Sequence, residues 1–373
     1  MNKRIVTLAG TLILLAAASS SAPSVAAAGQ FQPESTIAFS STRDHVSEGL
    51  TRPLLGAEVY LMKPVMVMNP EGTTTWALTS PRRLTGLDAS FDGFANLSPD
   101  GKKIVFDSTR LTGEINSSDL FLMNTDGTEQ TLLTRGSSAT WSPDSKNIAF
   151  HASASYYASG GLVTGDPIRT DVGSSTTDSD IFVANVDDLL AGVEQPTNIT
   201  NSPGMIDDDA DWSPDGQKIV FTSHPVTDDP GFSNQTELYL MNPDRTGLLP
   251  LTSNNEEERG PAWAPDGSRI VFMCRIGGGT NLFQICVMNA DGTGLMQLTD
   301  NSTFHGSPTF SPDGQQILFH ARVGTMLRSG NQQLFIMNVD GTDQTQLTFG
   351  TPTSGDGVNN LAHWGELRVR GTP

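Results

Sequence analysis

The sequence has 373 residues, of which 37 are glycine, 22 are proline and 7% are aromatic, a composition typical of a turn-rich β protein rather than of a helical bundle. Its 41 acidic residues outnumber 22 basic ones, and the formal net charge of −19 argues against a nucleic-acid partner because phosphates would be repelled. Two cysteines are too few for a disulfide scaffold or a four-cysteine zinc site.

The N-terminal segment has the pattern of a signal peptide. Lys3 and Arg4 precede an apolar run over residues 5–18, and small residues ending at Ala28 offer a cleavage site. No cysteine near this site could carry a lipid, and no later segment is apolar enough to span a membrane. We therefore predict a cleaved signal peptide over residues 1–28 and a periplasmic or secreted protein without a membrane span, acting as a monomer.

Three short sequence motifs, called phrases below, then recur in a fixed order along the chain, which is the signature of a repeat architecture. The first, typified by Trp-Ser-Pro-Asp-Gly and then Ile-Val-Phe, occupies residues 96–106, 140–150, 211–221, 262–272 and 309–319. The second, typified by Leu-Tyr-Leu-Met-Asn-x-Asp, occupies residues 119–127, 180–187, 237–244, 284–292 and 333–341. The third is a Leu-Thr or Ile-Thr pair at residues 84–85, 133–134, 199–200, 251–252, 298–299 and 347–348.

Each set of phrases predicts four short antiparallel strands, named a to d. Pro-Asp-Gly and Asn-x-Asp-Gly between apolar runs are typical of tight hairpin turns. Because the apolar runs are nearly unbroken, both faces of each sheet must be covered by neighbouring sheets, as in a β-propeller. Strand b occurs six times, from residues 37–39 onward, and residues 361–365 supply the strand a that the first copy lacks. We predict an all-β, six-bladed propeller over residues 35–370, closed by the C-terminal strand.

These phrases resemble the repeat of TolB-type propellers. The resemblance implies the same six-bladed fold, with partners docking at the mouth of the central channel. TolB proteins also carry an α/β domain before the propeller. In this sequence the repeats begin about ten residues after the predicted cleavage site, so we expect a propeller without that domain.

Five polar residues stand at the same place in the repeat, five positions before the strand-a aromatic or its equivalent. This connector enters each blade near the channel, so we predict a ligand-binding mouth formed by Asp92, Asp207, Asp209, Glu258, His305 and Asn359. The alternative is that connectors are polar simply because they meet water. The long connection over residues 152–179 adds the pair Tyr156 and Tyr157, which we expect to be exposed beside the mouth, unless the connection is merely a tolerated insertion.

The run of aspartates in this region is a candidate calcium site. Asp207, Asp209 and Asp211 alternate, so in a regular strand their carboxylates would share one face. The alternative is a solvated acidic segment, because the following residues depart from the calcium-loop pattern. Cys274 and Cys286 lie on adjacent predicted strands, where a disulfide and two buried thiols are both compatible with the sequence.

The sequence contains no Gly-x-Ser-x-Gly, P-loop or His-Glu-x-x-His motif, so no catalytic residues are predicted. We expect a binding module for an envelope or secreted protein or peptide of cationic character, with no required cofactor beyond the candidate Ca²⁺. The alternative is a carbohydrate-active enzyme, lyase or hydrolase-like, that uses a cation bound in the channel.

Overall fold

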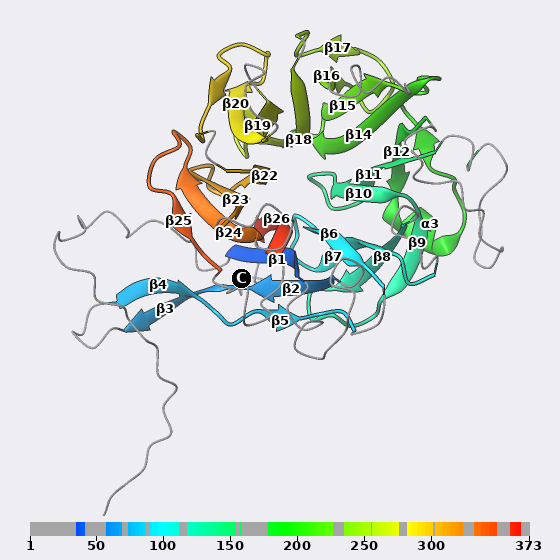
Figure 1. Cartoon of the computed structure of the whole chain (residues 1–373). Helices are drawn as coiled ribbons and strands as arrows, with labels where there is room; N and C mark the ends of the chain where they lie inside the picture. The colour runs from blue at the N-terminus through cyan, green and yellow to red at the C-terminus, as the bar shows by residue number, and fades with distance from the viewer. Residues whose placement is uncertain are drawn as a thin grey trace, which may run out of the picture.

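A computed structural model describes residues 35–41, 57–68, 74–86, 90–111, 118–153, 157, 178–226, 235–254, 256–275, 282–300, 303–323, 332–348 and 359–366. Figure 1 shows six sheets arranged around a ring, each with four antiparallel strands. The predicted six-bladed all-β propeller is therefore confirmed. Among the described residues no helix is long and apolar enough to cross a membrane. The predicted signal peptide lies outside the described residues.

The strands of each blade are hydrogen-bonded in the order a, b, c, d. Blade 1 contains β26 (Asn359–Glu366), β1 (Ser35–Ser41), β2 (Glu58–Met62) and β5 (Arg82–Arg83). Blades 2 and 3 contain β6 (Asp92–Leu97), β7 (Lys103–Ser108), β8 (Asp119–Asn124) and β9 (Thr131–Arg135), and then β10 (Ser137–Trp141), β11 (Asn147–Ala152), β12 (Asp180–Asn185) and β13 (Thr197–Asn198). Blade 4 contains β14 (Met205–Trp212), β15 (Ile219–Pro225), β16 (Glu237–Met241) and β17 (Leu249–Pro250). Blades 5 and 6 contain β18 (Glu257–Trp263), β19 (Arg269–Arg275), β20 (Gln284–Asn289) and β21 (Met296–Gln297), and then β22 (His305–Phe310), β23 (Gln316–Arg322), β24 (Gln332–Asn338) and β25 (Thr345–Gln346).

Blade 1 joins the two ends of the chain. The C-terminal strand β26 pairs with β1 and places Trp364 opposite Ile37, so the predicted closure is confirmed. Two segments of this blade resembled strand c in sequence. The first, β2, is the strand paired in the blade, whereas the second, β3 (Pro64–Met68), pairs with β4 (Thr74–Leu78) in a separate hairpin.

The turns at one end of the blades are built as their sequences predict. In four of the a–b turns a serine hydroxyl donates to the aspartate two residues later, as from Ser98 to Asp100 (2.7 Å), where Gly101 takes φ +71°. In four of the c–d turns the aspartate accepts from the threonine two residues on, as Asp291 does from Thr293. We call this end, which carries the a–b and c–d turns, the turn end.

At the opposite end, which we call the mouth end, strands a and c begin. In five blades the threonine of the Leu-Thr or Ile-Thr pair accepts a hydrogen bond from a backbone N–H near the start of strand c, as Thr299 does from the Ile285 N–H (3.0 Å). In blade 2 the hydroxyl of Thr134 lies 2.8 Å from that of Tyr157. In three of these five blades the threonine hydroxyl donates to the first residue of strand c, as Thr299 does to Gln284 (2.9 Å). In blade 4 Thr252 donates to Glu258. The Leu-Thr pair therefore ties strand d to strand c at the mouth end.

Blade 3 departs from the repeat at its c–d connection. A short helix, α3 (Val186–Ala191), replaces the tight turn, and the side chain of Asn185 caps it by accepting from the N–H groups of Asp187 and Asp188. Gly192 ends the helix in the left-handed conformation, as is usual for a helix C-terminus.

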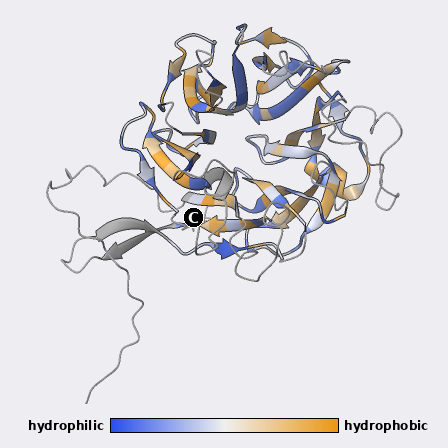
Figure 2. Ribbon diagram, in the orientation of Figure 1, coloured by the Kyte–Doolittle hydropathy of each residue, from blue (hydrophilic) through white to orange (hydrophobic). Residues whose placement is uncertain are grey.

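The hydrophobic core is divided among the blade interfaces. Six clusters of buried side chains each combine residues from two neighbouring blades, such as Phe272 of blade 5 with Leu238 of blade 4. Figure 2 shows long hydrophobic stretches along strands such as β24, whereas β14 and β18 beside the ring centre are largely hydrophilic. Both faces of a blade are therefore buried, and polar side chains concentrate on the innermost strands.

Candidate binding site

The innermost strands form a closed ring in which each strand a contacts the two beside it. Each of these six strands is interrupted by a β-bulge at an equivalent place in the repeat, one to four residues after the strand begins. The bulge residue has positive φ in five described blades: Phe94, Ser138, Asp209, Gly260 and Ser307. Since a bulge redirects side chains and frees backbone groups from the ladder, it decides what strand a presents at the mouth end.

The aligned mouth positions are structurally equivalent, because each one is fixed to the preceding blade by its backbone. The N–H of Asp92 donates to Ala57, that of Asp207 to Ser179, and that of Glu258 to Thr236. His305 makes the same bond to Phe283. In every case the acceptor is the residue immediately before strand c of the preceding blade.

These equivalent side chains are buried, however, and do not line an open surface. Asp92, Asp207, Glu258 and His305 are at most 5% exposed. Arg110 donates to Asp92 (2.8 Å), Asn254 donates to Glu258 (2.9 Å), and Ser202 donates to Asp207. Their described contacts join connectors and blades together. Only the backbone of Asn359 is described, and this residue begins β26.

The residues that reach the surface at this end lie one or two positions further along strand a. Asp208 and Arg259 are 26% and 36% exposed, and His151 on the neighbouring strand b is 23% exposed. Nδ1 of His151 lies 3.7 Å from Oδ1 of Asp208, and Ser179 donates to the same oxygen (2.9 Å). With the bulge residue Asp209, these residues form a set of ionisable side chains across blades 3 to 5, which we call the mouth arc: His151, Asp208, Asp209 and Arg259.

The mouth arc is continued by a buried carboxylate in blade 2. Asp107 accepts from the backbone N–H of Ser138 (3.1 Å) and from the hydroxyl of Ser137, so it fixes the bulge of blade 3. Burial raises the pKa of Asp107 to about 7, although these hydrogen bonds and nearby His151 oppose the shift. Burial and the adjacent Asp208 also raise the pKa of Asp209.

Two further acids on the innermost strands have pKa values raised mainly by burial: Glu258 at the mouth end and Asp211 close to the turn end. The pKa of Asp211 rises to about 6, and that of Glu258 rises to about 7 with an additional contribution from Glu237. The charge at the mouth end therefore becomes more negative as pH rises through neutrality.

The three aspartates of the candidate calcium site do not point to one place. The bulge between Asp208 and Asp211 breaks the alternation on which that expectation depends. Asp209 accepts from the Gly260 N–H (3.1 Å), and Asp211 accepts from the Trp263 N–H (2.8 Å) and the Thr140 hydroxyl (2.9 Å). Within the described ranges no group of three or more His, Cys, Asp or Glu residues is arranged to hold a metal ion.

Tyr157 also differs from its expected exposed position. Its ring packs on Phe182 (4.6 Å between centroids), and its hydroxyl donates to the Arg135 carbonyl (2.6 Å). The aromatic ring fills the side of blade 3 and does not form a wall beside the mouth. Tyr156 lies outside the described residues.

His305 and the cysteine pair complete the residues that the sequence singled out, and His320 lies beside His305 on the neighbouring strand. Nδ1 of His305 lies 3.1 Å from Oε1 of Gln284, and burial lowers its pKa. Burial also lowers the pKa of His320 to about 3, so this ring is neutral. Cys274 and Cys286 form a buried disulfide with a Cα–Cα distance of 5.9 Å, which joins strands b and c of blade 5.

Comparison with known proteins agrees with this architecture. The TolB beta propeller domain matches residues 232–364. This match covers the part of the chain from blade 4 to the closing strand, and the whole chain has the fold of a six-bladed β-propeller. A solved TolB from Acinetobacter baumannii superposes with a TM-score of 0.61 at 18% identity, over 88% of this chain and 66% of that one. The structure of a TolB from Agrobacterium tumefaciens, described as putative, gives a TM-score of 0.54 at 17% identity, over 90% and 99% of the two chains.

The same fold recurs in a protein of different function. Hydrazine synthase from Kuenenia stuttgartiensis gives a TM-score of 0.61 at 14% identity, over 90% of this chain and 47% of the synthase chain. A search of curated proteins returned no match. At these identities the solved structures establish the fold alone, and function has to be argued from the site.

Proposed function

We propose that this protein is an exported binding module that takes a cationic segment of a protein or peptide at the mouth end. The observation that carries this proposal is the mouth arc, in which Asp208 and Asp209 present carboxylates on bulged strands. A rigid propeller holds these groups in place, so binding would cost little ordering of the protein. The net charge of −19 adds long-range attraction for a cationic partner.

The form of strand a supports a binding role for these two residues. Asp209 is a non-glycine residue at φ +52°, a conformation that costs energy and that persists where the surroundings enforce it. The Gly260 N–H holds one of its carboxylate oxygens, Oδ2. Asp208 is oriented by Ser179 and lies beside His151. Carboxylates oriented in this way are suited to an Arg or Lys side chain of a partner.

The proposal is tested by affinity capture from an envelope extract, using the wild-type chain and the variant Asp208→Asn with Asp209→Asn. Asparagine tolerates positive φ and keeps an acceptor oxygen, so the bulge should survive the change. A matched control removes two exposed charges at the turn end, Glu129→Gln with Asp343→Asn. We expect a protein to be retained by the wild type and the control, released by salt, and lost from the mouth variant.

Two results would contradict the proposal: retention of the same protein by the mouth variant, or no specific protein retained by the wild type. A parallel capture with EDTA tests whether Ca²⁺ contributes, and fractionation of cells expressing the chain tests the exported location. The carbohydrate-active alternative remains a separate prediction, to be tested with glycan substrates.

A further inference from the structure

The turn end of blades 3 to 5 carries a concentration of exposed apolar side chains. Among the described residues seven large hydrophobic side chains are well exposed, and six of them lie in the c–d connections and d strands of these three consecutive blades. They are Leu190, Val193, Leu248, Leu249, Leu295 and Met296, with exposures between 45% and 67%. We call this set the apolar rim.

The apolar rim departs from the repeat, which shows that the fold does not require it. Strand pairing places Leu249 and Met296 at the same position of strand d. The other four blades carry polar residues at that position: Arg82, Thr131, Thr197 and Thr345. Threonine occupies this position in three other blades, so an exposed leucine or methionine is not needed to form the blade. Contact with a partner is therefore the better explanation for these two residues.

Two of the connections that carry the rim contact a neighbouring blade. The Arg245 guanidinium, in the c–d turn of blade 4, donates to the Asn198 carbonyl on strand d of blade 3. The c–d turn of blade 5 lies directly on strand d of blade 4, because a Cβ on Gly292 would stand 2.7 Å from the Leu251 carbonyl oxygen. The connections that carry the exposed side chains of blades 4 and 5 therefore each rest on the outer edge of the blade before.

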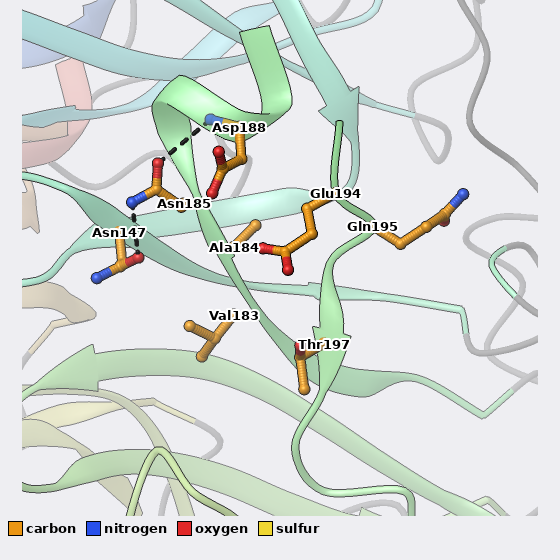
Figure 3. A pocket seen from close by; sticks show the side chains of 8 residues that line it. All are labelled: Asn147, Val183, Ala184, Asn185, Asp188, Glu194, Gln195 and Thr197. Carbon is orange, nitrogen blue, oxygen red and sulfur yellow. Dashed lines mark hydrogen bonds between the residues drawn. The ribbon is translucent and has the colours of Figure 1, made fainter. Parts of the chain in front are cut away.

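A pocket of about 170 Å³ opens beside the apolar rim in blade 3. It is lined by Asn147, Val183, Ala184, Asn185, Asp188, Glu194, Gln195 and Thr197. Figure 3 shows the carboxylates of Asp188 and Glu194 directed into the same space, and no lysine or arginine is among the lining residues. Leu190 follows Asp188 by two residues, and Val193 immediately precedes Glu194. The acidic pocket and the apolar rim therefore adjoin.

We propose that the apolar rim and this pocket together bind a basic, apolar polypeptide segment of another protein. The pocket would take a lysine or arginine side chain, and the rim would cover leucine-like side chains. The net charge of −19 disfavours a second copy of the chain as the occupant. Contact through side chains is favoured over an added strand, since Pro250 on the outer edge of blade 4 has no N–H to donate. This surface is at the opposite end of the blades from the mouth arc and does not depend on the proposed function.

The test uses the full chain and a short fluorescein-labelled peptide of alternating leucine and arginine, followed by fluorescence anisotropy. Two comparison peptides replace leucine by serine or arginine by glutamate. The protein variants are Leu249→Ser with Met296→Ser in the rim, and Asp188→Asn with Glu194→Gln in the pocket. The matched control makes serine substitutions at the equivalent exposed position of blades 2 and 6, Thr131→Ser with Thr345→Ser.

We expect binding of the leucine–arginine peptide to weaken by about tenfold or more in the rim variant and in the pocket variant, and to be unchanged in the control. Both comparison peptides should bind the wild type more weakly. Equal binding to the rim variant and the wild type, equal binding of the serine peptide, or no binding at all would overturn the inference. Sedimentation that shows a wild-type dimer, lost in the rim variant, would overturn it as well, because the occupant would then be a second copy.

Discussion

The c–d turn glycines allow a direct test of how the blades are held together. Gly292 has φ +83°, and a Cβ there would lie 2.7 Å from the Leu251 carbonyl oxygen of the neighbouring blade. Gly204 has nearly the same φ, +80°, but nothing lies within 4 Å of its Cβ position. Alanine at Gly204 therefore meets only the backbone cost of the left-handed conformation, about 1–2 kcal/mol. Alanine at Gly292 adds a contact that the backbone must move to relieve, about 1–3 kcal/mol more.

The measurement is urea-induced unfolding followed by tryptophan fluorescence, since Trp141, Trp212 and Trp263 lie in blade cores or at their edges. We expect Gly292→Ala to lower the unfolding midpoint clearly more than Gly204→Ala does. Gly341→Ala should reproduce the larger effect, because Gly341 has φ +85° and the same 2.7 Å approach to Leu298. Equal losses for Gly204→Ala and Gly292→Ala would refute the claim that close backbone approach between blades, and not φ alone, requires glycine.

Two further predictions concern the mouth end. Burial raises the pKa of Asp107 from 3.8 to about 7, so the native state binds this proton more tightly than the unfolded chain does. The contribution of this proton to the free energy of unfolding is fully present below pH 4 and is lost as pH rises through 7. Thermal unfolding of Asp107→Asn across this range should show a weaker decline than the wild type, and an identical decline would exclude Asp107 as its source. Thr299→Val removes the acceptor for the buried Ile285 N–H and should lower the free energy of unfolding by about 1–3 kcal/mol, whereas the exposed Thr131→Val should change it by less than about 0.5 kcal/mol. Similar denaturation midpoints for these two variants would contradict the role assigned to the Leu-Thr pair.

The repeated phrases predicted the blades because each phrase acts through local chemistry. Pro-Asp-Gly supplies a turn, and runs such as Ile270–Phe272 can be buried only between sheets, so the count of blades and their closure followed from the sequence. The c–d connection of blade 3 is an exception to the repeated turn, and its sequence explains the difference. There Asn185 caps a helix instead of bracing a tight turn.

The site was harder to predict because a bulge leaves little trace in sequence. Phe94, Ser138, Asp209, Gly260 and Ser307 share a backbone conformation but no side-chain property. The predicted mouth positions are equivalent in space, yet the bulge and the connector bury them. The exposed charges come from the next residues, such as Asp208 and Arg259. The position after the strand-b phenylalanine, occupied by Asp107 and His151, was the available signal for the rest of the site.

The pairing of β26 with β1 has a consequence for how the chain acquires its structure. Blades 2 to 6 can assemble as soon as their own strands have been synthesised, because their hydrogen bonds are local in sequence. The edge of β1 stays unpaired until residues 359–366 emerge, and until then blade 1 offers a template to any other extended chain. A late arrest of translation would therefore leave a nearly complete ring that is prone to aggregate. The exposed edge of β1 is covered only when β26 has been synthesised and has paired with it.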